Sequence, residues 1–232
     1  MHFPRVIKNY GDKTLDSVVY LLNSGYLPEA IINYIALLGW SPKDNKEFFT
    51  LDELIKEFDI TRIRKDSSNY DIKKLRWYNA HYIKQMSQDE YLDFILPFFI
   101  KNCNMSGKSK EFIEKLALLY RPQVTYGLEI VELTKVFFYD DIVYEKECRP
   151  YLNSHPNITN IIISFRDEIS KITNWDNSNI NNCLNNVSKV CNAVGEDLYM
   201  PIRIAISGRL EGPDIIDTIY LIGKDKILNR LG

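Results

Sequence analysis

Apolar residues recur at helical spacing along most of this 232-residue sequence. For example, Ile31, Ile35 and Leu38 fall on one side of a helix, and Pro28 suits the first turn of that helix. The same spacing covers residues 15–22, 50–58, 91–100, 109–120, 125–139, 158–173, 178–194 and 213–222. The pattern therefore predicts a chain built mainly from short helices with one apolar side.

Two Ser/Thr-x-x-Glu sequences mark helix starts. Thr50 is followed three residues later by Glu53, and Ser87 is followed in the same way by Glu90. In such a capping box the hydroxyl and the carboxylate satisfy backbone N–H groups that the first turn leaves unpaired. We therefore predict helices that begin directly after Thr50 and Ser87.

Strand signals are weak in this sequence. Residues 201–207 alternate, with Ile202, Ile204 and Ile206 in every second position, which admits one short strand. The predicted fold class is nevertheless all-α. Loops are expected near residues 41–49, 64–70, 103–108 and 149–157.

Composition predicts a globular protein outside membranes. The hydrophobic content of 45% is sufficient for a core, and no apolar run approaches the length of a membrane span. We expect a soluble, cytoplasmic protein. The net charge of −2 argues against nucleic-acid binding by bulk electrostatics, so any RNA-binding face must be local.

The sequence offers no convincing catalytic or metal site. Its four cysteines form no Cys-x-x-Cys pair and its glycines form no phosphate-binding loop, so no metal and no cofactor are expected. Asp140 and Asp141 are sequence neighbours, which do not share a helix face, and are interpreted as a solvated loop. His81 is expected to be half-buried or to face RNA rather than to act as an acid or base.

Four segments follow one another in the order that is typical of one protein family. They are Gly25-Tyr26-Leu27-Pro28-Glu29-Ala30 with Asn33-Tyr34 and residues 37–41, residues 70–77 with Asn79 and Tyr82-Ile83, residues 200–208, and Gly212-Pro213 with residues 221–224. Together they resemble the C-terminal half of bacterial-type glutamyl-tRNA synthetases, which are class I aminoacyl-tRNA synthetases. The resemblance is weakest between about residues 100 and 195.

In that family, the resemblance implies, a His-x-Gly-His motif and a Lys-Met-Ser-Lys-Ser-like loop activate glutamate with ATP. No His-x-Gly-His occurs in this sequence, and residues 1–11, where the loop should stand, retain at most Lys8. A loop that stabilises the ATP phosphates needs its cations in place. We therefore expect the chain alone to be inactive as a ligase, whether it is a natural truncation or a fragment.

The resemblance also implies three functional regions after this degraded loop. Residues 12–86 would be a helical stem-contact region, and residues 87–150 and 151–232 would form a two-part helical anticodon-binding domain. The implied partner is a tRNA with a glutamate or glutamine anticodon, and a separate catalytic domain is a second candidate. Unpaired anticodon bases can stack on aromatic rings and accept or donate hydrogen bonds along their edges.

Residues suited to such contacts occupy the matching positions. They are Trp77, Gln123, Arg203, Gly212, Pro213 and Ile215. Arg203 matches an arginine that touches the anticodon loop, whereas Trp77 could equally be a core tryptophan. Gln123 departs from the arginine that some relatives carry, and because an amide lacks the fixed charge and forked donors of arginine, strict reading of the last anticodon base is in doubt.

Two functions from different classes remain open. The first is a tRNA-binding module, and the second is a helical protein-interaction module that has lost RNA binding. A clustered basic face containing Arg203, Arg209 and Lys224 would favour the first. A large exposed apolar patch would favour the second.

Overall fold

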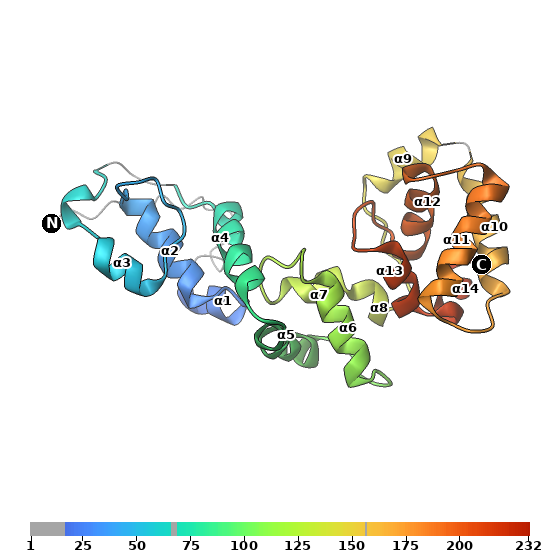
Figure 1. The fold of residues 1–232 in the computed structure, drawn as a ribbon, viewed down its shortest axis with the longest axis horizontal. Helices are drawn as coiled ribbons and strands as arrows, with labels where there is room; N and C mark the ends of the chain where they lie inside the picture. Colours follow the sequence, from blue (N-terminus) through green and yellow to red (C-terminus); the bar gives the residue numbers. More distant parts are fainter. Residues whose placement is uncertain (1–16, 66–68, 156) are drawn as a thin grey trace. The chain divides into compact units, whose positions relative to one another are not determined.

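The computed structural model describes residues 17–65, 69–155 and 157–232. In this part of the chain the secondary structure is helical and no strand of a sheet occurs, which confirms the predicted all-α fold class (Figure 1). An isolated antiparallel bridge joins Trp40 and Ile63. The degraded loop expected at residues 1–11, with Lys8, lies outside the described residues.

The helices group into two compact units. The first comprises the described residues up to Cys103 together with Arg121–Glu132, and the second comprises Asn104–Tyr120 and Leu133–Gly232. The helices of the first unit are α1 (Val18–Asn23), α2 (Pro28–Gly39), α3 (Leu51–Glu57), the 3₁₀ turn η1 (Ile60–Arg62), α4 (Ile72–Gln85), α5 (Gln88–Asn102) and most of α7 (Glu129–Leu133). Those of the second are α6 (Lys110–Tyr120), α8 (Lys135–Phe138), α9 (Cys148–Ser154), α10 (Ile158–Ser170), α11 (Asn177–Cys191), α12 (Glu196–Ser207), α13 (Ile215–Ile222) and α14 (Lys224–Leu231).

These units divide the chain at positions other than residues 86 and 150, where region boundaries were expected. The expected regions describe which part of a tRNA each stretch would contact. The division into compact units does not test which part of a tRNA each stretch would contact, so the expected regions stay a prediction.

Both predicted capping boxes are present. The Thr50 hydroxyl accepts a hydrogen bond from the Glu53 backbone N–H at 3.2 Å, and the Glu53 carboxylate accepts one from the Thr50 N–H at 2.8 Å. Ser87 and Glu90 make the same pair of bonds at 3.3 and 2.7 Å. Helices α3 and α5 therefore begin where the local sequence predicts.

The short strand that the sequence admitted does not form, and two local expectations were wrong. Residues 201–207 lie in α12 and form no strand. Ile202, Ile204 and Ile206 are all buried, since α12 packs against α10, α13 and α14 and so has apolar neighbours on more than one side. The loop expected at residues 149–157 contains most of α9, and the single helix expected at residues 125–139 is divided into α7 and α8.

A buried amide joins three segments of the first unit. The Asn79 side chain of α4 is fully buried and its Oδ1 accepts a hydrogen bond from the Leu27 N–H at 2.7 Å. Its Nδ2 donates to the Thr125 carbonyl at 2.6 Å and lies 3.4 Å from the Gly25 carbonyl. These bonds tie α4 to the turn before α2 and to the segment that contains Thr125, although the partners are far apart in sequence.

Two glycines allow these segments to approach closely. Gly25 has a φ of +86°, and a side chain on it would overlap the backbone of Gly127. A side chain on Gly127 would overlap the Phe98 ring. The Gly127 N–H donates to the Gly25 carbonyl at 3.0 Å, and the Leu128 N–H donates to the Ser24 carbonyl at 2.8 Å. Glycine is required at Gly25 both for its backbone conformation and for the contact.

The core of the second unit forms between α10 and α11, with α12, α13 and α14 packed around them. Phe165 and Ile169 of α10 and Ile180 and Leu184 of α11 are buried there. Arg230 of α14 donates from Nη1 to the Ile206 carbonyl at 2.8 Å and from Nη2 to the Tyr139 carbonyl at 2.9 Å. A partly buried arginine thus holds the end of α12 and the residue after α8, since its forked donors can serve several carbonyls at once.

Candidate nucleic-acid interface

The first candidate surface is an exposed aromatic group on α4. The Trp77 side chain is 46% exposed, so it is not a core tryptophan. Its ring lies 4.8 Å from that of Phe48, and Phe48 stacks on His81 at 3.6 Å with an angle of 15° between the rings. Lys73 and Lys84 on the same helix are also exposed. An exposed ring flanked by cations is the arrangement on which unpaired bases stack.

Asn33 of α2 fixes the segment that carries Phe48. Its fully buried Nδ2 donates to the Glu47 carbonyl at 2.8 Å, and its Oδ1 accepts from the Phe49 N–H at 2.7 Å. The Tyr82 hydroxyl lies 3.0 Å from the same Oδ1 and 2.8 Å from the Phe49 carbonyl. The position of the aromatic group is therefore set by buried hydrogen bonds rather than by a free loop.

His81 has the surroundings of a stacking residue. Burial, and to a smaller extent the charge of Lys84, lowers the pKa of His81 below its usual value. Its Nε2 lies 2.8 Å from the Gln85 side-chain amide. The ring is half-buried, which is one of the two surroundings expected from the sequence, and the lowered pKa favours the neutral form.

Gln123 lies partly exposed in the turn after α6. Its neighbour Arg121 does not supply the charge that Gln123 lacks, because the Arg121 guanidinium donates to the Met86 carbonyl at the end of α4 and lies 5.0 Å from the Tyr91 ring. Arg121 therefore stabilises the first unit.

Arg203, Gly212 and Pro213 are brought together in the second unit. Nη2 of Arg203 donates to the Pro213 carbonyl at 2.7 Å. A side chain on Gly212 would overlap Nη1 of Arg203, so the guanidinium lies directly against this turn. Burial lowers the pKa of Arg203 below the usual arginine value. The arginine thus braces the turn, and one of its amino groups is already engaged.

The remaining predicted residue, Ile215, is buried with 7% exposure. It begins α13, whose N-cap Asp214 accepts hydrogen bonds from the Ile216 N–H at 2.9 Å and the Asp217 N–H at 3.0 Å. Ile215 therefore anchors the turn from inside, whereas Gly212, Pro213 and Asp214 are accessible at the surface.

The basic face that would favour RNA binding is not formed by the three expected cations. Arg203 is engaged as described, and Arg209 forms an ion pair with Glu145 at 3.7 Å. Lys224 donates to the carbonyls of Ser170 and Ile172 at 2.7 and 2.6 Å, at the end of α10, where a cation is favourable. All three cations therefore make hydrogen bonds or an ion pair within the second unit, and these contacts stabilise its fold.

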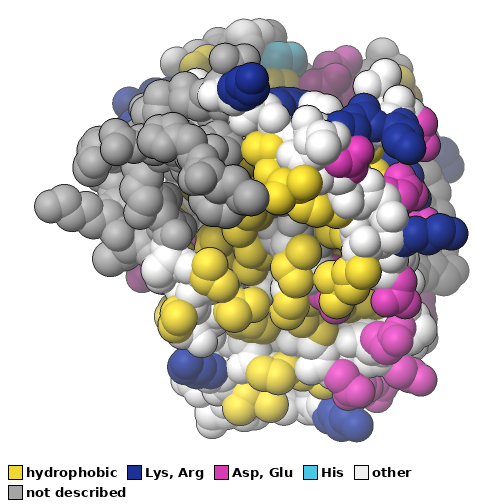
Figure 2. All heavy atoms as spheres, turned by 90° about the vertical axis from the view of Figure 1, so that its left-hand side faces the viewer, with side chains coloured by type: hydrophobic (Ala, Val, Ile, Leu, Met, Phe, Trp, Pro, Cys, Tyr) yellow, Lys and Arg dark blue, Asp and Glu magenta, His cyan; other side chains and the backbone are white. Residues whose placement is uncertain are grey.

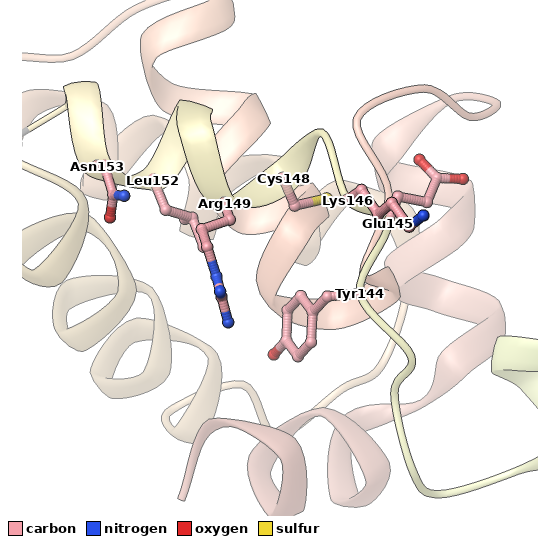
Figure 3. Close-up of a pocket in the computed structure, with 7 residues that line it drawn as sticks. All are labelled: Tyr144, Glu145, Lys146, Cys148, Arg149, Leu152 and Asn153. Carbon is pink, nitrogen blue, oxygen red and sulfur yellow. The ribbon is translucent and has the colours of Figure 1, made fainter.

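A hollow of about 660 Å³ in the second unit was not predicted from the sequence (Figure 3). Arg149 and the Tyr144 ring extend into the same open space, and Lys146 and Asn153 also line it. Tyr144 is 53% exposed. The sequence signal was an aromatic residue with two cations within six residues, but neither an element nor a role was predicted for residues 142–148.

The described part of the chain gives little support to a metal site or to a reactive thiol. No group of three or more histidine, cysteine, aspartate or glutamate side chains there could hold a metal ion. Cys148 and Cys183 are buried, and burial raises the pKa of Cys183 to about 12, so this thiol is not activated. None of the described helices has both the length and the apolar character needed to cross a membrane.

Sequence comparison assigns both ends of the chain to known families. The profile of the anticodon binding domain matches residues 82–232, which is more than half of the chain. The chain belongs to the anticodon binding domain family. The profile described as the catalytic domain of class I tRNA synthetases for E and Q matches residues 12–77. The stretch expected to contact the tRNA stem therefore carries a family match to part of a catalytic domain.

The relatives agree with this assignment. The glutamate–tRNA ligase of Bacillus licheniformis is 37% identical over 211 residues, which are 89% of this chain and 43% of the relative, and that of Bacillus subtilis is 36% identical over the same length. A crystal structure of a glutamate tRNA ligase from Elizabethkingia meningosepticum, in complex with its amino acid, matches with a TM-score of 0.69 and 29% identity over 89% of this chain and 40% of that one. This chain corresponds to the C-terminal half of a glutamyl-tRNA synthetase and spans between 40% and 44% of the length of these relatives.

Proposed function

We propose that this chain is the tRNA-binding part of a glutamate–tRNA ligase that works in the cytoplasm, and that it binds a tRNA with a glutamate or glutamine anticodon. One observation carries the proposal. Arg203, Gly212 and Pro213 meet in a braced surface turn, and the segment that contains them matches the anticodon binding domain.

The proposed contacts use local features rather than overall charge. The turn at residues 212–214 presents backbone groups in a fixed geometry because Arg203 holds it. Trp77 supplies an exposed ring for stacking, and the hollow beside Tyr144 and Arg149 supplies a second ring next to a cation. Stacking on an aromatic side chain contributes about 1 to 3 kcal/mol per base.

Binding of tRNA should depend only weakly on salt. Few phosphate contacts are expected of a chain of net charge −2, and two such contacts would correspond to a loss of affinity of about tenfold between 50 and 200 mM salt. Filter binding with unmodified glutamate tRNA at both concentrations measures this. A tRNA of unrelated anticodon is the control. If the unsubstituted chain does not bind glutamate tRNA at low salt, the proposed function is wrong.

The purified chain should show no glutamate-dependent exchange between ATP and pyrophosphate. The sequence has no His-x-Gly-His motif and at most Lys8 of the phosphate-binding loop, so the ATP phosphates lack their stabilising groups. Exchange of labelled pyrophosphate is the measurement, with the intact Bacillus subtilis ligase as positive control. Exchange above background would show that the activating groups lie elsewhere in the chain.

A protein-interaction role is the second candidate function. It is favoured by exposed apolar side chains on the helices of the first unit, which an RNA-binding surface does not require.

A further inference from the structure

The segment between α8 and α9, which we name the strap (residues 142–147), is held against the end of α12. The Glu145 N–H donates to the Gly208 carbonyl at 2.9 Å, and the buried Cys148 thiol donates to the same oxygen at 3.1 Å. Gly208 has a φ of +72°, and a side chain on it would overlap the Val143 carbonyl. Glycine is therefore required there for both its conformation and the close approach. The strap has a fixed position and is not a free loop.

The hollow between the strap and α9 combines an exposed ring with unpaired cations. Tyr144 comes from the strap and Arg149 from the first turn of α9, and both side chains extend into the same space (Figure 3). Neither Arg149 nor Lys146 makes a hydrogen bond or an ion pair within the described part of the chain. The lining carboxylate of Glu145 is paired with Arg209 at 3.7 Å. The hollow thus carries positive charge that no lining carboxylate balances.

This lining suits a nucleotide. The volume of about 660 Å³ falls within the range of about 300 to 1,000 Å³ that small-ligand sites occupy. A base can stack on the Tyr144 ring while its phosphate takes the charges of Arg149 and Lys146. Asn153, which also lines the hollow, can donate and accept along a base edge. Because bases inside a duplex cannot reach such a ring, the nucleotide must be unpaired.

The hollow lies close to the turn that Arg203 braces. The strap rests on Gly208, which is four residues from Gly212, and four residues of extended chain span at most about 14 Å. Stacked nucleotides rise by about 3.4 Å each, so about four of them cover this distance. An RNA loop that contacts residues 212–214 can therefore place a neighbouring nucleotide in the hollow.

We infer that the hollow binds one unpaired nucleotide of the tRNA outside the anticodon triplet, with the base on Tyr144 and the phosphate on Arg149 and Lys146. This inference rests on the proposed function, because it assigns a second nucleotide site on the same tRNA. Arg203 and its turn read the triplet. The hollow adds affinity with little dependence on the triplet, since every base has a face that can stack.

Tyr144→Ala should weaken filter binding of unmodified glutamate tRNA by about 5- to 150-fold, the range for one stacked base. The ratio of affinities for matched and altered anticodons should stay that of the parent, which separates this site from Arg203. Tyr144→Phe keeps the ring and should restore most of the affinity. The matched control is Tyr199→Ala, which removes a 38% exposed ring of the same unit outside the hollow and should bind as the parent does.

Arg149→Ala should weaken binding and also reduce the slope of log affinity against log salt by about 1, because one phosphate contact is lost. Arg149→Lys keeps the charge and should keep the slope. Lys189→Ala removes an exposed cation of α11 and should change neither quantity. A slope that Arg149→Ala leaves unchanged would overturn the phosphate contact.

A fluorescent adenine analogue, placed in turn at each unpaired loop position outside the triplet, tests stacking directly. At one position its fluorescence should change when the parent or Tyr144→Phe is saturating, but not with Tyr144→Ala. Equal affinity of Tyr144→Ala and the parent would overturn the inference and leave the proposed function standing. Failure of the parent to bind tRNA would overturn both. Tighter binding of adenosine monophosphate than of tRNA would assign the hollow to a free nucleotide and would also overturn the inference.

Discussion

Replacing Asn79 by alanine should lower the free energy of unfolding of the first unit by about 3 kcal/mol. The buried amide accepts from the Leu27 N–H and donates to the Thr125 carbonyl, and both groups lose their partner in the variant. Each unpaired group that is kept from water costs about 1 to 3 kcal/mol. Since the two segments are joined through this side chain, their packing against α4 should loosen together.

Urea denaturation followed by tryptophan fluorescence measures this effect. Trp40 and Trp77 lie in the first unit and Trp175 lies in the second, so a Trp175→Phe background reports on the first unit alone. Asn102→Ala is the matched control. Asn102 is exposed, and its side chain donates to the Phe98 carbonyl of its own helix, so this change should cost less than about 0.5 kcal/mol. An equal change in the free energy of unfolding in the two variants would show that the hydrogen bonds of Asn79 do not stabilise the first unit.

Arg203→Ala should weaken binding of glutamate tRNA by about 5- to 150-fold, equivalent to about 1 to 3 kcal/mol, and should reduce anticodon preference at the same time. The arginine both braces the Pro213 carbonyl and carries further N–H donors. Gly212→Ala should reproduce much of this loss while keeping the arginine, because the new methyl group occupies the place of Nη1 and displaces the guanidinium.

Filter binding with tRNAs of matched and altered anticodon separates these effects from a general loss of charge. Arg166→Ala removes an exposed arginine of the same unit and should change affinity little. Gln123→Ala should also change it little, because a neutral amide is replaced. Circular dichroism must show an intact helical fold for each variant. Unchanged affinity of Arg203→Ala, with the parent binding tRNA, would exclude a role for this turn in recognition.

Several residues of the first unit that carried the family resemblance are explained by its fold. Gly25 allows a close approach to Gly127, Asn79 joins three segments, and Asn33 with Tyr82 fixes the loop before α3. Substitutions at these positions should therefore act on stability first. An effect on RNA binding would be indirect, through the position of Trp77 and its neighbours.

The sequence alone determined the fold class, many of the helices, the starts of α3 and α5, and the family. Apolar spacing of three and four residues, Pro28 and the boxes at Thr50 and Ser87 act within one or two helical turns, so no tertiary information was needed. The all-α class follows from these local signals. Where they failed, at α12, the helix is buried on more than one side, and its apolar residues no longer follow a single helical stripe.

Only the tertiary structure decided what the polar side chains do. Arg203, Arg209 and Lys224 looked like a basic face in the sequence, yet their hydrogen bonds and ion pairs reach residues between 10 and 76 positions away. The same holds for Asn79, whose partners are 46 to 54 positions away. Whether a charge is exposed or engaged depends on which carbonyls and carboxylates the fold brings within reach, and local sequence does not contain that distance. The exposure of apolar side chains on α1, α2 and α3 (Figure 2) was likewise undetermined, because an apolar helical stripe has the same pattern whether or not a neighbour covers it.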